Sequence, residues 1–307
     1  MNRISLIVFC IFFISPFLLL GYSVNKETHV FLEKDGQQLK MDIYQSDSLA
    51  LLPRPCIVFV FGGGFKEGTR DYEKYSNFFN YFANKGFVVV SIDYRLGMKD
   101  QSAPGLLNYK PLQNAISLAV SDLYSATNFL LENADELYID PSLIIISGSS
   151  AGAITVLQAD YEERDNHSSA DILPEDFHYA GVISFAGGIF STEGLPSYTQ
   201  KPAPTLFFHG SADRLVPFDK KRLFHIGMFG SNSLVKRFKQ ERYPYMYYRI
   251  EDIGHEVSES PMNEFLPEIE KFITDLILDR KQLMIDISYK DKMKKSRFSV
   301  SPGNFYK

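Results

Sequence analysis

Residues 143–152 of the chain read Leu-Ile-Ile-Ile-Ser-Gly-Ser-Ser-Ala-Gly. The first four residues are apolar and mostly β-branched, as in a strand that is buried on both faces of a sheet. Glycines stand two positions before and two positions after Ser150, which gives a G-x-S-x-G pattern. At a sharp turn from strand to helix, glycine at these two positions lets backbone segments approach closely, and the turn lifts the central hydroxyl clear of the sheet. The stretch therefore predicts that Ser150 is a nucleophile at the end of a buried strand.

Continuous apolar runs recur along the chain and alternate with helical patterns. A hairpin predicted over His29–Tyr44 precedes them. The runs cover residues 56–61, 87–92, 143–146, 180–185, 205–208 and 247–250, and the helical patterns cover 75–85, 115–131 and 264–278. Strands of this kind form a parallel sheet with helices on both faces. The fold class is therefore α/β, and functional groups are expected just beyond the carboxyl ends of the strands.

A serine hydroxyl needs a base before it can act as a nucleophile. Of the six histidines, His255 is the best candidate, because it follows the run 247–250 and so lies at the predicted carboxyl edge. His209 ends the run 205–208, and we expect it to organise its loop through backbone contacts. The remaining histidines are in weaker positions: His29, His167, His178 and His225, the last on a predicted helix.

The base in turn needs an acid that fixes its tautomer and stabilises the imidazolium. Asp213 follows the run 205–208 and lies at the same predicted edge as His255. The order serine, aspartate, histidine along the chain is the one found in α/β-hydrolases. Asp219 and Asp252 are less favoured alternatives for this role.

Three glycines follow the first apolar run, in Phe61-Gly62-Gly63-Gly64-Phe65. The backbone amides of Gly63 and Gly64, together with that of Ala151, are expected to form an oxyanion hole for an incoming carbonyl oxygen. A glycine run after a strand also suits a phosphate group, but the lysine and Ser/Thr of a P-loop are missing. The sequence contains no metal-binding motif such as H-E-x-x-H.

Five motifs together make the chain resemble the α/β-hydrolase superfamily, and most of all its esterase/lipase branch, which includes hormone-sensitive-lipase-like and feruloyl-esterase-like enzymes. The resemblance implies a mostly parallel eight-stranded sheet, a Ser-His-Asp triad of Ser150, His255 and Asp213, and no cofactor. One departure is Phe61, which stands where this branch usually has histidine. The motifs are Phe61–Phe65, Asp93–Leu96, Gly148–Gly152, His209–Pro217 and Gly254-His255.

The ends of the chain define three segments. Residues 1–23 have the layout of a signal peptide, with Arg3, an apolar run over 4–20 and small residues at a cleavage point after Ser23. We therefore expect a secreted or periplasmic protein with no membrane span after cleavage, and a membrane anchor formed by residues 4–20 is the alternative. Residues 24–288 form the predicted hydrolase domain, and residues 289–307 a basic C-terminal tail that we expect to be solvated.

Composition excludes some functions. The chain has 307 residues, with 32 Lys and Arg against 37 Asp and Glu, and a formal net charge of −5. An acidic balance lacks the positive surface that general nucleic-acid binding requires, so we expect no nucleic-acid partner. Apolar residues make up 45% and charged residues 22%, as in an ordinary folded globule.

The expected function is that of a secreted serine esterase acting on small-molecule or carbohydrate-linked carboxylic esters, for example acetyl or feruloyl esters. Two alternatives stay open. One is a serine peptidase of the prolyl-oligopeptidase type, for which His209–Pro217 is also typical, and the other is a non-catalytic binding protein with the same fold. We expect the inserts at 97–110, 160–176 and 191–201 to line or cap the substrate pocket.

Overall fold

The structure is a computed structural model that describes residues 23–34, 36–46, 52–105, 107–298 and 300–306. The predicted signal peptide, residues 1–23, lies outside the described residues except for Ser23. In the part of the chain that is described, no helix combines the length and apolar character needed to cross a bilayer.

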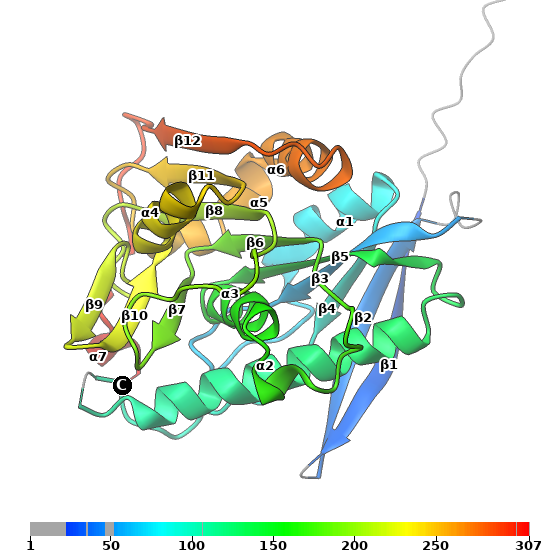
Figure 1. Ribbon diagram of the computed structural model, residues 1–307, viewed down its shortest axis with the longest axis horizontal. Helices are drawn as coiled ribbons and strands as arrows, with labels where there is room; N and C mark the ends of the chain where they lie inside the picture. The colour runs from blue at the N-terminus through cyan, green and yellow to red at the C-terminus, as the bar shows by residue number, and fades with distance from the viewer. Residues whose placement is uncertain (1–22, 35, 47–51, 106, 299, 307) are drawn as a thin grey trace, which may run out of the picture.

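A nine-stranded sheet runs through the described part of the molecule, in the order β1-β2-β4-β3-β5-β6-β8-β11-β12 (Figure 1). The strands β1 and β2 form the predicted hairpin, β2 also pairs antiparallel with β4, and all further neighbours are parallel. The α/β-hydrolase fold class is therefore confirmed, with β12 added to the eight expected strands. The bounds are β1 Val24–Lys34, β2 Gln37–Ser46, β3 Arg54–Val60, β4 Val88–Ile92, β5 Ile139–Ser149, β6 Gly181–Phe185, β8 Thr205–Gly210, β11 Tyr245–Ile250 and β12 Met284–Tyr289.

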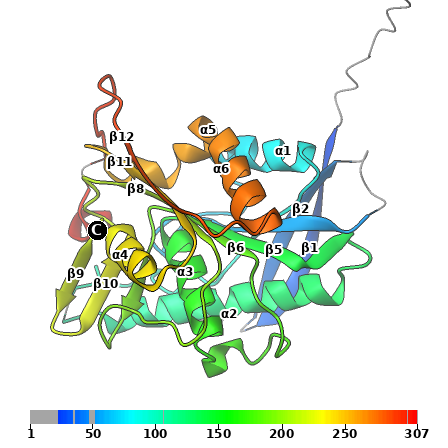
Figure 2. The same ribbon diagram turned by 45° about the horizontal axis from the view of Figure 1, so that its top comes forward.

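The central strands are buried because helices cover both faces of the sheet (Figure 2). The helices α1, α5 and α6 lie on one face, and α2 and α3 lie on the other. Aromatic side chains in register stack from strand to strand, since Phe208 lies 5.7 Å from Phe185 and 4.7 Å from Tyr248 between ring centroids. The helix bounds are α1 Ser76–Asn84, α2 Lys110–Glu132, α3 Ala151–Arg164, α4 Ser231–Glu241, α5 Pro261–Glu264 and α6 Leu266–Phe272.

The closing helix predicted over residues 264–278 is interrupted. Helix α5 ends before Phe265, α6 begins after it, and a π-helical stretch, η5, continues over Ile273–Leu278. Pro267 lies in the first turn of α6, where its missing N–H is tolerated, whereas it would break a continuous helix. The predicted inward face is present, because Phe272 and Ile273 are fully buried.

A second, three-stranded sheet lies beside the carboxyl edge of the main sheet. It consists of β7 (Gly188–Ser191), β10 (Ile226–Gly230) and β9 (Lys220–Leu223), paired antiparallel. His225 was predicted on a helix, but it lies in the turn between β9 and β10. This prediction was wrong because the antiparallel pairing of the two short strands determines the conformation of the segment.

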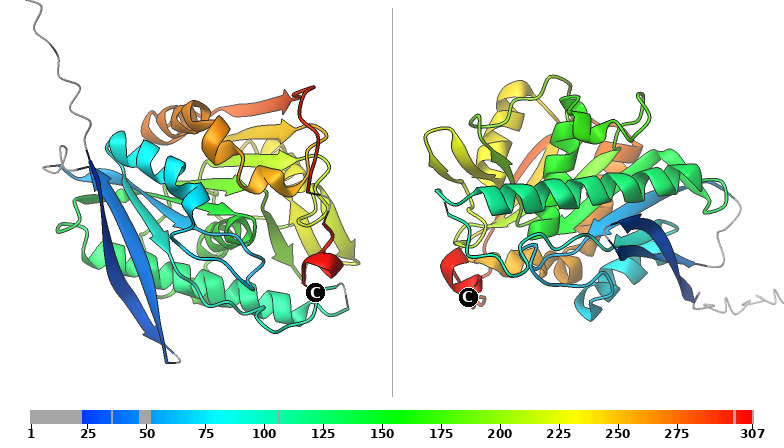
Figure 3. Two further views of the ribbon diagram at one scale, coloured as in Figure 1. Left: turned by 180° about the vertical axis from the view of Figure 1, so that it is seen from behind. Right: turned by 90° about the horizontal axis from the view of Figure 1, so that it is seen from below.

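The basic C-terminal tail only partly behaves as expected. Lys292, Lys294 and Lys295 are exposed, as a solvated tail requires. The residues that follow return to the molecule, and the short helix α7 (Pro302–Phe305) lies beside β9 and β10 (Figure 3). The expectation of a solvated tail is wrong for this part, because its aromatic side chains pack against the carboxyl edge of the sheet.

Candidate active site

Ser150 occupies the turn between β5 and α3 in a strained conformation, with φ 51° and ψ −112°. A non-glycine residue with positive φ persists only where the surrounding structure enforces it. The two flanking glycines provide this constraint. A Cβ on Gly148 would lie 2.3 Å from the carbonyl carbon of Gly152, and a Cβ on Gly152 would lie 1.9 Å from the carbonyl oxygen of Val60. The predicted reason for glycine at both positions is therefore present in the structure.

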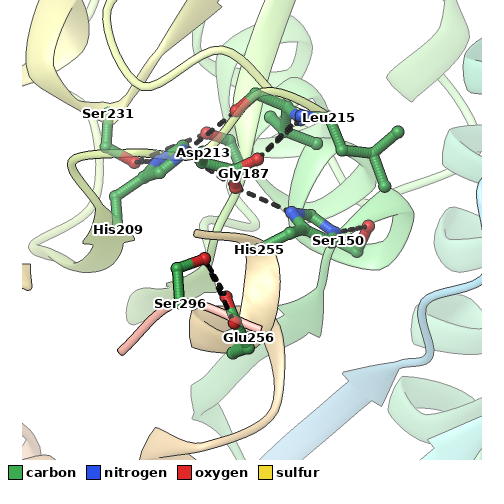
Figure 4. A network of polar contacts seen from close by, with 10 residues as sticks. Ser150, Gly187, His209, Asp213, Leu215, Ser231, His255, Glu256 and Ser296 are labelled. Atoms are coloured by element: carbon green, nitrogen blue, oxygen red, sulfur yellow. Dashed lines mark hydrogen bonds and ion pairs between the residues drawn. The ribbon is translucent and has the colours of Figure 1, made fainter. Parts of the chain in front are cut away.

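The three predicted side chains converge at the carboxyl edge of the sheet (Figure 4). The Oγ atom of Ser150 lies 2.7 Å from Nε2 of His255, and Nδ1 of His255 lies 2.7 Å from Oδ2 of Asp213. All three residues are buried. Since an ionised carboxylate only accepts hydrogen bonds, Nδ1 carries the proton and Nε2 is free to accept the one on Ser150. The arrangement can therefore move a proton from the hydroxyl to the imidazole.

Asp213 is held in its ionised form by its neighbours. The amides of Leu215 and Val216 donate to its Oδ1 atom at 2.9 and 3.2 Å. Burial alone would raise the pKa of Asp213, but hydrogen bonds from His209 and His255 outweigh it and hold the pKa well below its ordinary value. A carboxylate that stays charged can stabilise a positively charged imidazolium beside it.

His209 makes contacts beyond the backbone interaction that the sequence predicted. The residue is fully buried, with Nδ1 2.8 Å from Oγ of Ser231 and Nε2 3.3 Å from the carbonyl oxygen of Val216. The contact with Val216 is the backbone interaction that we predicted. In addition, Nε2 lies 3.4 Å from Oδ2 of Asp213. The spacing of four residues within one loop was the only signal for this contact.

The remaining candidates lie elsewhere. Asp219 accepts hydrogen bonds from Asn232 and Ser233, and Asp252 pairs with Lys290 on the surface. Neither aspartate is bonded to His255, so neither replaces Asp213. The other histidines belong to other parts of the fold: His29 is in β1, His167 and His178 follow α3, and His225 is in the β9–β10 turn.

The predicted oxyanion donors lie close to Ser150 in the structure, because Ala151 follows it and a Cβ on Gly62, the neighbour of Gly63, would lie 3.2 Å from the Cβ of Ser150. Gly63 and Gly64 have φ values of 117° and 63°, in the region that favours glycine. Among the described residues, no acceptor is paired with the amide of Gly63 or of Gly64. Ala151 is the first residue of α3, where an amide has no partner within the helix. These three amides are therefore available to a developing negative charge.

Two hollows meet at Ser150. An apolar cavity of about 110 Å³ is lined by residues such as Ile154, Phe190 and Met228. A larger groove of about 850 Å³ is lined by apolar residues and also by charged and polar ones such as Lys74, His255 and Glu259, and it is called the polar groove for these side chains. The two share three lining residues, Ser150, Leu215 and Phe305.

Only one of the three inserts reaches these hollows. The insert at 97–110 lines the apolar cavity through Pro104, Gly105 and Tyr109. Residues 160–176 and 191–201 line neither hollow, so the expectation for these two inserts was wrong. The first of them begins inside α3, where Asp160 is buried.

Among the described residues, no group of three or more His, Cys, Asp or Glu side chains could hold a metal ion.

Comparisons with known proteins point to the same fold. The sequence profile of the BD-FAE family matches residues 41–189, just under half of the chain. The structure of a thermophilic esterase from Thermogutta terrifontis with propionate bound superposes with a TM-score of 0.63, covering 82% of this chain and 94% of that one at 23% identity. At this identity the superposition shows the shared fold.

Sequence relatives match a shorter region. Esterase B1 of Culex pipiens is 31% identical over 120 residues, which are 38% of this chain and 21% of that protein. Gut esterase 1 of Caenorhabditis elegans is 29% identical over 121 residues, 39% of this chain and 21% of that protein. The chain thus matches about a fifth of the length of these relatives.

The fold is that of the α/β-hydrolases, and the candidate site holds a serine, a histidine and an aspartate that are connected by hydrogen bonds. The family profile and the named relatives make the chain similar to the esterase/lipase branch of the α/β-hydrolases.

Proposed function

We propose that the chain is a serine esterase that hydrolyses carboxylic esters through an acyl-enzyme. The observation that carries this proposal is the pair of hydrogen bonds, each of 2.7 Å, that connects Ser150 to His255 and His255 to Asp213. The esterase names of the relatives support the same reaction class. A binding protein without activity would need neither a strained Ser150 nor an aligned base.

In the proposed reaction each residue of the site has one task. Oγ of Ser150 attacks the ester carbonyl carbon while its proton passes to Nε2 of His255, and Asp213 stabilises the imidazolium. The amides of Gly63, Gly64 and Ala151 stabilise the oxyanion. When the tetrahedral intermediate collapses, the proton on His255 moves to the leaving alcohol. Water then attacks the acyl-enzyme by the same route, which releases the acid and restores Ser150.

Proton transfer to the alcohol decides how an ester lies in the two hollows. The alcohol oxygen must be within reach of Nε2 of His255, and His255 lines the polar groove and is not among the residues lining the apolar cavity. The alcohol part of the substrate therefore occupies the groove, and the acyl part occupies the cavity. A cavity of about 110 Å³ suits a short acyl chain. The thermophilic esterase with the same fold was solved with propionate and with butyrate, which are short acids.

The groove supports a polar alcohol. Lys74, Glu259 and Asn263 line it, together with the hydroxyls of Ser258 and Ser260. Such side chains bind hydroxyl-rich groups, so an acetyl or other short ester on a carbohydrate is the substrate class that we propose. Secretion directed by residues 1–23 would bring the enzyme to such material and is part of this proposal.

The test uses Ser150→Ala in the full chain. The unchanged protein is expected to hydrolyse p-nitrophenyl acetate and to lose this activity when paraoxon is added. Paraoxon phosphorylates the esterase from Thermogutta terrifontis. Ser150→Ala is expected to lose nearly all turnover and to take up no phosphoryl group, as measured by intact-protein mass spectrometry. Full activity of Ser150→Ala would contradict the proposal. Peptide substrates run beside acetyl and feruloyl esters separate an esterase from a peptidase.

A further inference from the structure

The C-terminal segment, residues 296–306 with residue 299 outside the described part, is attached beside His255 (Figure 4). The carboxylate of Glu256 accepts hydrogen bonds from the amide of Phe298 at 2.6 Å, from the amide of Arg297 and from the hydroxyl of Ser296 at 3.2 Å. The ring of Phe298 lies 5.7 Å from the ring of His255 between centroids. One end of the segment is therefore fixed next to the proposed base.

The other end is attached to the glycine loop. The hydroxyl of Tyr306 donates a hydrogen bond of 2.8 Å to the carbonyl oxygen of Gly64. The contact between the segment and this loop is close, because a Cβ on Gly64 would lie 2.4 Å from Cε1 of Phe305. One part of the segment therefore lies beside His255, and its other end lies against the proposed oxyanion loop.

Phe305 lies where the two hollows meet. It lines both the apolar cavity and the polar groove, as do Ser150 and Leu215. Pro302 and Tyr306, on either side of it in the chain, line the apolar cavity, whereas Phe298 lines the groove. The C-terminal segment is therefore a wall common to both hollows, and Phe305 is the residue of its described part that lines both.

We propose that Phe305 is a specificity-determining residue that closes the apolar cavity on the side where it meets the polar groove and limits the length of the acyl chain. The inference rests on the proposed function, because it assigns the apolar cavity to the acyl group. A longer chain would have to displace the ring of Phe305, which the anchors at Gly64 and Glu256 oppose. Tyr306 is a positioning residue, since its hydrogen bond to Gly64 keeps the segment in place.

The test compares p-nitrophenyl acetate, butyrate, hexanoate and octanoate as substrates of the full chain. In Phe305→Ala, the ratio of kcat/KM for octanoate to that for acetate is expected to rise about tenfold, because the cavity opens at this side. Tyr306→Phe retains the ring but loses the bond to Gly64, and it should shift the ratio in the same direction by a smaller factor. Asn304→Ala is the matched control, because Asn304 is exposed and lines neither hollow.

An unchanged chain-length profile in Phe305→Ala would overturn the inference. Phe305→Leu keeps an apolar side chain of smaller size, and it is expected to fold as the unchanged protein does and to shift the ratio part of the way. If Phe305→Ala is unstable, an unaltered profile in Phe305→Leu overturns the inference in its place. Failure of the proposed function is distinguishable, because the unchanged protein would then show no ester turnover and no phosphorylation of Ser150 by paraoxon.

Discussion

Nε2 of His209 lies 3.4 Å from Oδ2 of Asp213, the same carboxylate oxygen that contacts His255 at 2.7 Å. The carboxylate is thus placed between two histidines, of which one faces Ser150 and the other is fully buried. His209 has the contacts of a support that keeps Asp213 ionised and in position.

We predict that His209→Leu lowers both stability and turnover. The substitution removes a hydrogen-bond partner from Asp213 and from Ser231 in the interior, which costs about 2 kcal/mol in the free energy of unfolding. The less firmly held carboxylate should reduce kcat roughly tenfold, a small part of what a general base contributes. Urea unfolding and steady-state kinetics measure the two effects. His167→Leu, at an exposed histidine, is the control. Equal stability and equal kcat in the two variants would show that His209 does not support Asp213.

Asp213→Asn should separate the role of the charge from that of the shape. An amide of the same size can present a donor to His255 and favour the wrong tautomer, so kcat is expected to fall by about 10⁴-fold while the fold is retained. Asp252→Asn changes an exposed aspartate that pairs with Lys290, and its kcat should stay close to that of the unchanged protein. Comparable losses in both variants would mean that Asp213 has no special role.

Gly152→Ala tests the close approach behind Ser150. The added methyl group would lie 1.9 Å from the carbonyl oxygen of Val60, so the turn must move and Ser150 with it. Loss of nearly all activity and destabilisation by several kcal/mol are expected from such a backbone clash. Gly303→Ala meets no atom within 4 Å and is the matched control. Thermal unfolding and ester turnover of both variants give the comparison, and wild-type activity in Gly152→Ala would be incompatible with the structure.

Asp160 makes stability depend on pH. Burial raises its pKa to about 6, and the ion pair with Arg164 offsets this only in part. The unfolded chain releases this proton near pH 4, so between pH 4 and 6 the folded state binds more protons, and stability falls as pH rises through this range. The loss is complete above pH 6 and amounts to at most about 3 kcal/mol.

Asp160→Asn cannot ionise and should not show this loss. We subtract the unfolding free energy of the unchanged protein from that of Asp160→Asn. This difference is expected to be about 2 kcal/mol larger at pH 7 than at pH 4.5. Urea titrations at the two pH values measure it. Asp171→Asn, at an exposed aspartate, should show no such change with pH. A difference that is the same at both pH values would show that Asp160 is ionised throughout.

The sequence was sufficient to predict that the three side chains at the centre of the site lie close together. Buried parallel strands are continuous apolar runs, and their carboxyl ends must meet at one edge, so the positions of Ser150, Asp213 and His255 relative to these runs predicted that they would converge. The strand β12 was missed although its residues from Ile285 to Tyr289 alternate between apolar and polar, as in an edge strand. The break before α6 had a local signal in Pro267.

Other features had no local signal. The contact of Tyr306 with Gly64 joins residues 242 positions apart, and it depends on the edge of the sheet at which the chain leaves β12. The buried position of Asp160 likewise follows from packing, because the same residue in a polar stretch of sequence looks like part of a surface loop. Such features arise from long-range contacts that no window of residues contains.

The parallel pairing of β12 with β11 has a practical consequence. A parallel strand ends at the same edge of the sheet as its neighbour, so the chain emerges from β12 on the side where Ser150 lies. An affinity tag fused behind Lys307 would start two residues after Tyr306, which lines the apolar cavity, and would compete with bulky substrates for the entrance. Assays of an expressed protein should therefore be made after proteolytic removal of any such tag.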